Sequence, residues 1–399
     1  MTDWATKRLG EILQLNYGKS LPVKSRVDGA VPVYGSNGIV GAHNAPTVKK
    51  PGLILGRKGS AGRVHFSRGP FCPIDTTFYV TQDDAPDVDL EFLFFLLRHI
   101  DLTRITGDVG VPGLNRDMAY MEPAKIPATL PEQKKIAHIL STVQRAIEAQ
   151  ERIIQTTTEL KKALMHKLFT EGLRGEPQKQ TEIAPVPESW EVVPLSDCAV
   201  VQTGIAKGRK VDPEDSVALP YLRVANVQDG YLDLTEMKTI TIQKKERERY
   251  GLQDGDVVLT EGGDFDKLGR GFIWHGQIKE CVHQNHVFAV RPDTDRISSE
   301  FFAYQSQSSY GKAYFLSVAH KTTNLACINT TKLKAFPVLL PSPDEQLEIV
   351  GACQCIDGKI RAARTKRDQL QDLFRTLLHE LMTAKTRVNK LTFSDRYYE

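Results

Sequence analysis

Two stretches determine the fold: Pro131–Thr170, PEQKKIAHILSTVQRAIEAQERIIQTTTELKKALMHKLFT, and Pro343–Thr383, PDEQLEIVGACQCIDGKIRAARTKRDQLQDLFRTLLHELMT. In both, apolar residues recur at alternating steps of four and three residues over about five heptads, which is typical of long helices that pack side by side. The apolar residues of these two faces are Ile136, Leu140, Val143, Ile147, Ile154, Leu164, Leu168, Ile349, Ile356, Ile360, Leu370, Phe374, Leu377 and Leu381.

The two stretches are copies of one unit, offset by 213 residues. Glu132–Gln133 near the start of the first matches Glu345–Gln346 in the second, and both end on the string Leu-x-x-x-Leu-x-His-x-Leu. Two unrelated amphipathic helices would not share these residues, so the pattern indicates a duplication. Polar residues interrupt the apolar faces, and we expect them to fix the packing register. These interruptions are Gln150, Thr157, Lys161 and Arg367.

The segments before the helices also correspond, although they share little sequence. Trp190–Leu195 resembles Trp4–Leu9, and four further pairs of short segments follow in the same order. The chain of 399 residues therefore divides into two globule–helix repeats. The expected boundaries are a first globule at 1–128, a long helix at 129–172, a linker at 173–187, a second globule at 188–340, a second long helix at 341–385 and a loose tail at 386–399.

The bulk composition excludes several classes of protein. The six cysteines form no Cys-x-x-Cys pair, which argues against a zinc site and a disulfide framework. The first residues lack the apolar core of a signal peptide, and the longest apolar run, Phe92–Leu97, is far too short to span a bilayer. We therefore expect a cytoplasmic protein without a membrane partner.

Basic residues are concentrated in stretches that contain no acidic residue. Such stretches lie between Asp28 and Asp75, between Cys198 and Val211, and between Glu300 and Asp344, although the net charge is only +3. Surfaces of this kind suit a polyanion, because lysine and arginine release the counterions of phosphates, and arginine and asparagine can read base edges. The candidate DNA contacts are Arg57, Lys58, Arg63, Lys207, Arg209, Lys210, Lys267, Arg270, Lys321 and Asn324.

Catalytic signatures are missing from the sequence. It contains no Gly-x-Ser-x-Gly elbow, no His-Glu-x-x-His pair and no Asp/Asn-Pro-Pro-Tyr/Phe string of amino-methyltransferases. His283 and His286 lie in a strand-like run and would point to opposite faces, so we expect no metal site there. The sequence therefore indicates a protein that recognises DNA and does not catalyse a reaction.

The order globule–helix–globule–helix, the helix starts at Leu130–Gln133 and Pro341–Gln346, and the repeated helix ends resemble the specificity (S) subunit of type I restriction–modification enzymes. The resemblance implies an α+β fold with a pseudo-twofold internal repeat. In it, two tandem mixed α/β target-recognition domains are separated by two long helices packed as an antiparallel coiled coil.

The resemblance also implies the function. Each domain would read one half of a bipartite site in double-stranded DNA, and the helices would act as spacer and as docking site for two modification (methyltransferase) subunits, through which restriction subunits join. The chain itself would be no enzyme and hold no cofactor, because adenosylmethionine, ATP and Mg²⁺ would belong to partner subunits. Helices of about 40 residues, at roughly 1.5 Å per residue, give a spacer of about 60 Å.

Two other functions remain open from the residues alone. A coiled-coil scaffold would join proteins and never contact DNA, so a test of duplex binding would show no steep salt dependence. A nuclease or methyltransferase with its own active site would modify or cut DNA as a purified chain.

Overall fold

The computed structural model describes residues 4–106, 113–263, 265, 268–321 and 326–388. The chain divides into two compact units, which are described separately. Unit 1 comprises residues 1–151 and 364–399, and unit 2 comprises residues 152–363. Among the helices of the described ranges, none combines the length and the hydrophobicity of a membrane span.

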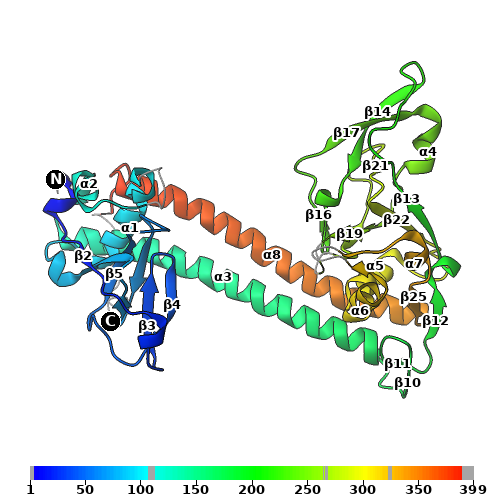
Figure 1. Ribbon diagram of the computed structural model, residues 1–399, viewed down its shortest axis with the longest axis horizontal. Helices are drawn as coiled ribbons and strands as arrows, with labels where there is room; N and C mark the ends of the chain where they lie inside the picture. The colour runs from blue at the N-terminus through cyan, green and yellow to red at the C-terminus, as the bar shows by residue number, and fades with distance from the viewer. Residues whose placement is uncertain (1–3, 107–112, 264, 266–267, 322–325, 389–399) are drawn as a thin grey trace. The chain divides into compact units, whose positions relative to one another are not determined.

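Two helices dominate the secondary structure. Helix α3 runs over Leu130–Glu171 and α8 over Pro343–Met382, which are 42 and 40 residues long. Each helix contributes one half to each unit. Within unit 1 the first half of α3 and the last half of α8 lie side by side with opposite chain directions (Figure 1). The sequence predicts both helices from their apolar spacing.

The rest of unit 1 is a small globule built mainly from short strands. Its strands are β1 (Trp4–Arg8), β2 (Asn16–Tyr17), β3 (Val31–Gly35), β4 (Gly38–His43), β5 (Gly52–Gly56), β6 (Val64–Ser67), β7 (Cys72–Pro73), β8 (Thr77–Thr81) and β9 (Pro123–Pro127). Its short helices are α1 (Leu90–Ile100) and α2 (Arg116–Met121). Asp89 caps α1 by accepting a hydrogen bond from the Phe92 N–H, and the apolar residues of α1 enter the core.

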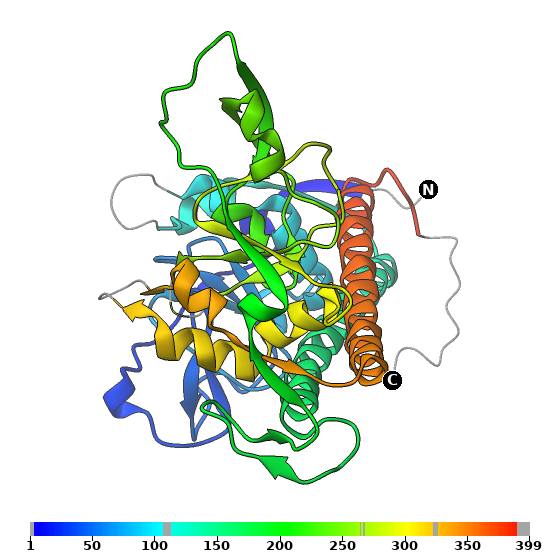
Figure 2. The same ribbon diagram turned by 90° about the vertical axis from the view of Figure 1, so that its right-hand side faces the viewer.

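In the described residues, unit 2 has more strands than unit 1 and a longer connection inside its second sheet. Its strands are β10 (Gln178–Lys179), β11 (Val186–Pro187), β12 (Glu191–Pro194), β13 (Ala199–Thr203), β14 (Ser216–Leu222), β15 (Val227–Gln228), β16 (Tyr231–Leu232), β17 (Lys238–Gln243), β18 (Val257–Thr260), β19 (Gly262–Gly263), β20 (Gly271–Ile273), β21 (Val282–His283), β22 (Val287–Pro292), β23 (His320–Lys321), β24 (Ala326–Cys327) and β25 (Pro337–Leu340). Its short helices are α4 (Arg247–Tyr250), α5 (Ser299–Gln307), α6 (Ser309–Val318) and α7 (Thr330–Lys334). The β14–β17 hairpin and α4 stand out from the rest of this unit (Figure 2).

The two globules share one sheet topology. In unit 1 the main sheets have the orders β2-β8-β5-β6, β4-β3-β7 and β1-β9. In unit 2 the corresponding orders are β13-β22-β18-β20, β17-β14-β21 and β12-β25. In both units the second sheet joins an antiparallel hairpin to a parallel neighbour. The expected α+β fold with an internal repeat is confirmed.

A buried Glu–Gln pair fixes each globule to the start of a long helix. In unit 1 the Gln133 side chain accepts from the Asp89 N–H at 2.8 Å and donates to the Pro127 carbonyl at 3.1 Å. In unit 2 Gln346 accepts from the Ser298 N–H at 3.0 Å and donates to the Pro341 carbonyl at 3.3 Å. The Gln133 and Gln346 side chains are both buried, and an unmade hydrogen bond is costly in such surroundings. The Glu–Gln repeat in the sequence is therefore an anchor.

The described residues differ from the sequence expectation in two connecting segments. The 173–187 segment contains the β10–β11 pair, and Val186 is fully buried in the core of unit 2. The beginning of the expected loose tail is ordered: Val388 is buried in unit 1, and Arg387 forms an ion pair with Glu132 at 3.0 Å. Isolated anchoring residues of this kind leave no periodic pattern in the sequence.

Candidate nucleic-acid interface

Three of the predicted contacts of unit 1 lie on one loop. Arg57, Lys58 and Arg63 occupy the connection between β5 and β6, and the side chains of Lys58 and Arg63 are exposed. Gly62 allows this loop to turn, because its φ is +80° and a Cβ there would lie 2.5 Å from the Leu102 carbonyl carbon. Arg63 donates to the Asn37 side-chain oxygen at 3.2 Å. The loop therefore presents basic side chains on a constrained backbone.

Arg57 is held in place by two neighbours that the sequence did not single out. Its Nε and Nη2 donate to the Asp75 carbonyl at 3.1 and 2.6 Å. Its guanidinium lies 5.4 Å from the Tyr17 ring centroid, and the Arg116 guanidinium lies 5.3 Å from the same ring. Two cations around one exposed aromatic ring are mutually tolerated through cation–π attraction. Only the fold brings these three side chains together, since Tyr17 on β2 and Arg116 on α2 lie far from Arg57 in the sequence.

The second group of predicted contacts lies on the loop that follows β13. Lys207, Arg209 and Lys210 are exposed there, and the Lys207 ammonium lies 5.7 Å from the Tyr221 ring centroid. Arg209 is paired with Glu246 at 2.5 Å. The hydrogen bond from Arg209 holds the pKa of the Glu246 carboxyl below its usual range. Arg209 therefore carries a compensated charge, whereas the sequence treats it as an open cation.

A hollow of about 420 Å³ lies beside this ion pair. It is lined by the loop after β13, including Ile205 and Arg209, and by the β17 residues Thr239–Ile242 with Glu246. The lining mixes apolar side chains with one compensated pair, and nothing in it resembles a catalytic constellation.

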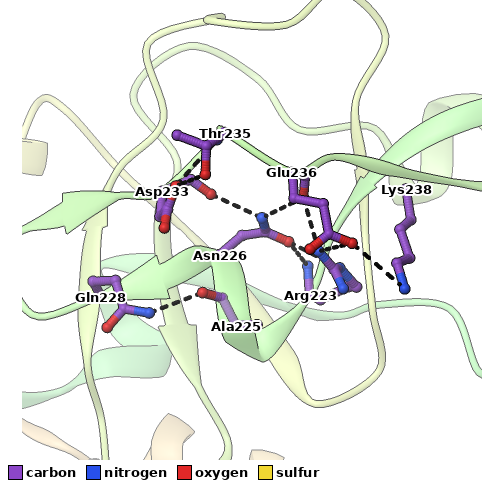
Figure 3. Close-up of polar contacts among 8 residues, drawn as sticks. All are labelled: Arg223, Ala225, Asn226, Gln228, Asp233, Thr235, Glu236 and Lys238. Atoms are coloured by element: carbon purple, nitrogen blue, oxygen red, sulfur yellow. Dashed lines mark hydrogen bonds and ion pairs between the residues drawn. The ribbon is translucent and has the colours of Figure 1, made fainter. Parts of the chain in front are cut away.

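Arg270 lies immediately before β20 and contacts a polar side chain. Its Nη1 donates to the Gln228 side chain at 3.2 Å. The neighbouring insertion between β14 and β17 is organised by buried Asn226 (Figure 3). The Asn226 amide donates to the Asp233 and Glu236 carbonyls at 2.8 and 3.1 Å, and its oxygen accepts from the Arg223 N–H at 3.0 Å. Unit 1 has a tight β3–β4 turn where unit 2 has this insertion.

Three further predicted contacts concern the segment near β23 and the loop before β20. Lys321 is exposed on β23, which pairs with β24. Lys267 and Asn324 lie outside the residues that the structure describes.

The histidines of unit 2 have separate roles. His283 is fully buried, and its Nδ1 lies 2.6 Å from the Val287 carbonyl oxygen. Burial lowers the pKa of His283. His286 is exposed, and its Nδ1 lies 2.5 Å from Glu261 Oε2. Across the described part of the chain, no group of three histidine, cysteine, aspartate or glutamate side chains could hold a metal ion.

The apolar residues of the long helices lie mostly inside their own units. Nine of them, such as Leu140 and Ile349 with no exposed surface, belong to the buried cores. The partly buried members are Val143, Ile154, Leu164, Leu370 and Leu377. These side chains can therefore form the spacer, but their burial does not suit them to dock a second protein. Other apolar side chains of the two helices are exposed, such as Ile153, Leu160 and Leu373, which are 47%, 58% and 46% exposed.

Comparison with known proteins adds the following findings. Residues 1–158 and 187–372 match the family described as "Type I restriction modification DNA specificity domain". The MjaVIII specificity subunit, from a type I restriction enzyme of Methanocaldococcus jannaschii, is 26% identical over 412 residues, which cover 98% of this chain and 95% of that protein. The EcoKI specificity subunit of Escherichia coli is 24% identical over 277 residues, which cover 66% of this chain and 54% of that protein.

A solved structure has the same fold. The S subunit of a type I restriction–modification system from M. genitalium matches with a TM-score of 0.63 and 16% sequence identity, and the match covers 96% of each chain. At this identity the likeness concerns the fold.

Proposed function

Because the chain belongs to the type I restriction–modification DNA specificity family, we propose that it is the sequence-reading subunit of such a complex. It binds double-stranded DNA and assembles with two modification subunits and, through them, with restriction subunits. It is not itself an enzyme. A protein-joining scaffold without DNA recognition, the alternative that the sequence leaves open, is not favoured by the family match.

The observation that carries this function is one sheet topology that occurs twice with different side chains. A repeated fold places the same loops at the same edges, so each copy can present its own side chains to a groove of DNA. Two such readers on one pair of helices suit a bipartite target. We therefore assign residues 1–128 and 188–340 to two target-recognition domains.

The basic side chains on the loops are proposed to contact DNA in two ways. Exposed lysines such as Lys58, Lys207 and Lys321 supply charge to phosphates, which gives affinity and salt dependence. Arginines held by neighbours, such as Arg57 and Arg270, have a fixed orientation that base reading requires. Arg209 can reach DNA when its pairing with Glu246 is exchanged for a phosphate.

The long helices are proposed as spacer through their buried faces and as docking site through their exposed faces. Leu160 and Leu373 occupy equivalent positions of the repeat and are both exposed, which suits two copies of one partner. Adenosylmethionine, ATP and Mg²⁺ are assigned to partner subunits, and the complex is assigned to the cytoplasm.

An exchange of one domain tests the bipartite reading. Residues 188–340 are replaced by the equivalent segment of a relative, and the chimera is co-expressed with its modification subunits. Sequencing of methylated host DNA should show that one half of the recognised sequence changes while the other half is retained. A change in both halves, or in neither, would overturn the assignment of one half to each domain. A binding constant that does not fall as salt rises would instead support the scaffold.

A further inference from the structure

The backbone hydrogen bonds of the two globules define equivalent positions residue by residue. The Gly56 N–H donates to the Arg63 carbonyl at 2.8 Å, and the Thr260 N–H donates to the Arg270 carbonyl at the same distance. One residue further along, the Arg57 N–H donates to Thr76, and the matching N–H of unit 2 is that of Glu261, which donates to His286. Arg63 therefore corresponds to Arg270, and Arg57 corresponds to Glu261.

A third hydrogen bond checks this assignment from the opposite side. The Arg57 carbonyl accepts from the Leu114 N–H at 2.8 Å, and the Glu261 carbonyl accepts from the Ile328 N–H at 2.9 Å. The helices that follow begin at equivalent caps, since the Asn115 and Asn329 side chains each accept from a backbone N–H of their helix. The equivalence therefore does not depend on an alignment of sequence.

The segment opposite these positions also matches. The Thr77 N–H donates to the Ile74 carbonyl at 2.9 Å, and the Val287 N–H donates to the Gln284 carbonyl at 2.8 Å. Counting along these turns, Thr76 corresponds to His286. A Cβ on Gly18 in unit 1 or on Gly204 in unit 2 would lie 2.1 Å from a carbonyl oxygen of this segment. Both units therefore pack a glycine against the equivalent turn, so the turn has the same position relative to Arg57 and Glu261.

The chemistry at the matched positions is the same at one place and opposite at the other. Arg63 and Arg270 keep an arginine in both units. At the neighbouring position unit 1 has Arg57 and unit 2 has Glu261. The neighbours of these two residues differ as well. Arg57 lies beside the Tyr17 ring, which Arg116 also contacts, whereas Glu261 lies beside His286.

The groups that remain for a ligand follow from the contacts. Arg57 uses its Nε–H and one N–H of Nη2 on the Asp75 carbonyl, so the pair of donors at the end of the guanidinium points away from that anchor. Glu261 uses Oε2 on His286, so Oε1 is the oxygen that can accept from a base. Unit 1 thus offers donors, and unit 2 offers an acceptor.

We propose that Arg57 and Glu261 are the specificity-determining residues at one equivalent position of the two half-sites. Arg57 reads guanine, whose O6 and N7 accept two hydrogen bonds from a guanidinium, and Glu261 reads cytosine, whose N4 amino group donates to a carboxylate. Tyr17 and Arg116 position Arg57, and His286 positions Glu261. This inference rests on the proposed function and deepens it, because it names the bases that the two domains distinguish.

The test selects binding sequences from a pool of randomised DNA duplexes with the full-length chain and with each variant. Arg57→Gln should remove the guanine preference at one base pair of one half-site, by roughly 5- to 150-fold. Glu261→Gln should relax one base pair of the other half-site to a similar extent. In each case the untouched half-site should keep its sequence.

Two further variants separate reading from charge and from folding. Arg57→Lys keeps the charge but lacks the planar fork, so it should retain affinity at low salt while weakening the guanine preference. Arg68→Gln, an exposed arginine of the same domain paired with Glu91, serves as the matched control and should leave the selected sequence unchanged. Equal midpoints of thermal unfolding for all the variants should accompany these results.

The outcomes distinguish this inference from the proposed function. If the unaltered chain enriches a bipartite sequence and both variants enrich the same sequence, the assignment of Arg57 and Glu261 is wrong while the proposed function stands. A uniform change of affinity without a change in base preference would likewise overturn the assignment, because it would show that neither residue reads a base. If the unaltered chain enriches no sequence at all, the proposed function itself fails.

Discussion

At one set of equivalent positions, the two units join their globules to the long helices through different kinds of contact. In unit 1 the contact is aromatic: the ring centroids of Phe95 on α1 and Phe374 on α8 lie 6.0 Å apart. The Arg98 guanidinium lies 5.2 Å from the Phe374 ring centroid and donates to Gln144 on α3 at 3.2 Å. Burial of the two rings therefore stabilises this contact.

In unit 2 the equivalent positions carry polar side chains. Lys161 replaces Phe374 in the repeat, Asp357 replaces Gln144, and Tyr304 replaces Phe95. Asp357 accepts from the Tyr304 hydroxyl at 2.8 Å and forms an ion pair with Lys161 at 2.7 Å. The Lys161 and Asp357 side chains are only 16% and 26% exposed, so a loss of either leaves a poorly solvated charge.

The polar contact of unit 2 explains the interruption of the apolar face at Lys161. Two apolar faces of equal spacing could pack in many registers and with many partners, whereas a half-buried Lys–Asp pair is satisfied in one arrangement. The aromatic contact of unit 1 contributes more to stability, and the polar contact of unit 2 contributes more to uniqueness. Three substitutions can test this comparison.

The largest effect is expected for Phe374→Ala. Phe374 is 6% exposed, and truncation of a buried phenylalanine costs about 3–5 kcal/mol of the free energy of unfolding. Hydrogen exchange of the α1 amides, measured at increasing urea concentration, reports this loss within unit 1. The neighbouring Leu373→Ala is the matched control, because Leu373 is 46% exposed and should change stability by about 0.5 kcal/mol or less. Equal losses for the two variants would contradict the aromatic contact.

A smaller loss, of about 1–3 kcal/mol, is expected for Asp357→Ala, because Lys161 and the Tyr304 hydroxyl both lose their acceptor. Adding Lys161→Met should restore part of this loss by removing the uncompensated charge. The control is Gln144→Ala at the equivalent position of unit 1, which removes two exposed hydrogen bonds, with Arg98 and Glu148, and should cost less. If the double variant is no more stable than Asp357→Ala, Lys161 does not depend on this pair.

The smallest effect concerns pH and two histidines of unit 1. Burial, and secondarily His379, lowers the pKa of His99, and the two ring centroids lie 5.9 Å apart. The unfolded chain therefore takes up the proton more readily, so this contribution to stability is complete above pH about 6.5 and is lost as the pH falls below it. Lys385, whose Nζ lies 3.0 Å from His379 Nε2, adds a positive charge on the same side.

Hydrogen exchange of α1 between pH 7 and pH 5 checks this expectation, with His99→Gln as the variant that should flatten the profile. In unit 2 the equivalent of His379 is His166, which instead meets the Ser309 hydroxyl at 2.8 Å. Local exchange is required because buried His283, whose pKa is also lowered, gives unit 2 its own acid sensitivity. A profile that is unchanged by His99→Gln would exclude His99 as its source.

The sequence predicts the long helices and the repeat because these depend on local spacing. Lys161 and Arg367 are recognisable in the sequence as polar interruptions of the apolar helix faces. The partner of Lys161 lies on another helix, so the heptad spacing does not predict it. Similarly, the glycines around Arg57 mark a turn, while its neighbours Tyr17 and Arg116 come from distant segments. Packing between elements that lie far apart in the sequence decides such contacts, and the residue spacing of a single sequence does not reveal it.

The same limit applies to the surroundings of the candidate site residues. Arg209 is one of several exposed cations by composition, yet the fold brings Glu246 to it. The apolar faces of α3 and α8 are readable as packing surfaces, but whether they face their own chain or another protein depends on the globules that cover them.

The division of the helices between the units has a consequence for the order of synthesis. Unit 2 is one uninterrupted piece of chain, 152–363, whereas unit 1 needs residues 364–399 to close a core that includes Phe374, Leu381 and Val388. On the ribosome the part that is translated first must therefore wait for the part that is translated last. A stop codon in place of Arg364 would leave unit 2 complete, whereas unit 1 would lack part of its core. Proteases should therefore degrade the amino-terminal globule of such a truncated chain first.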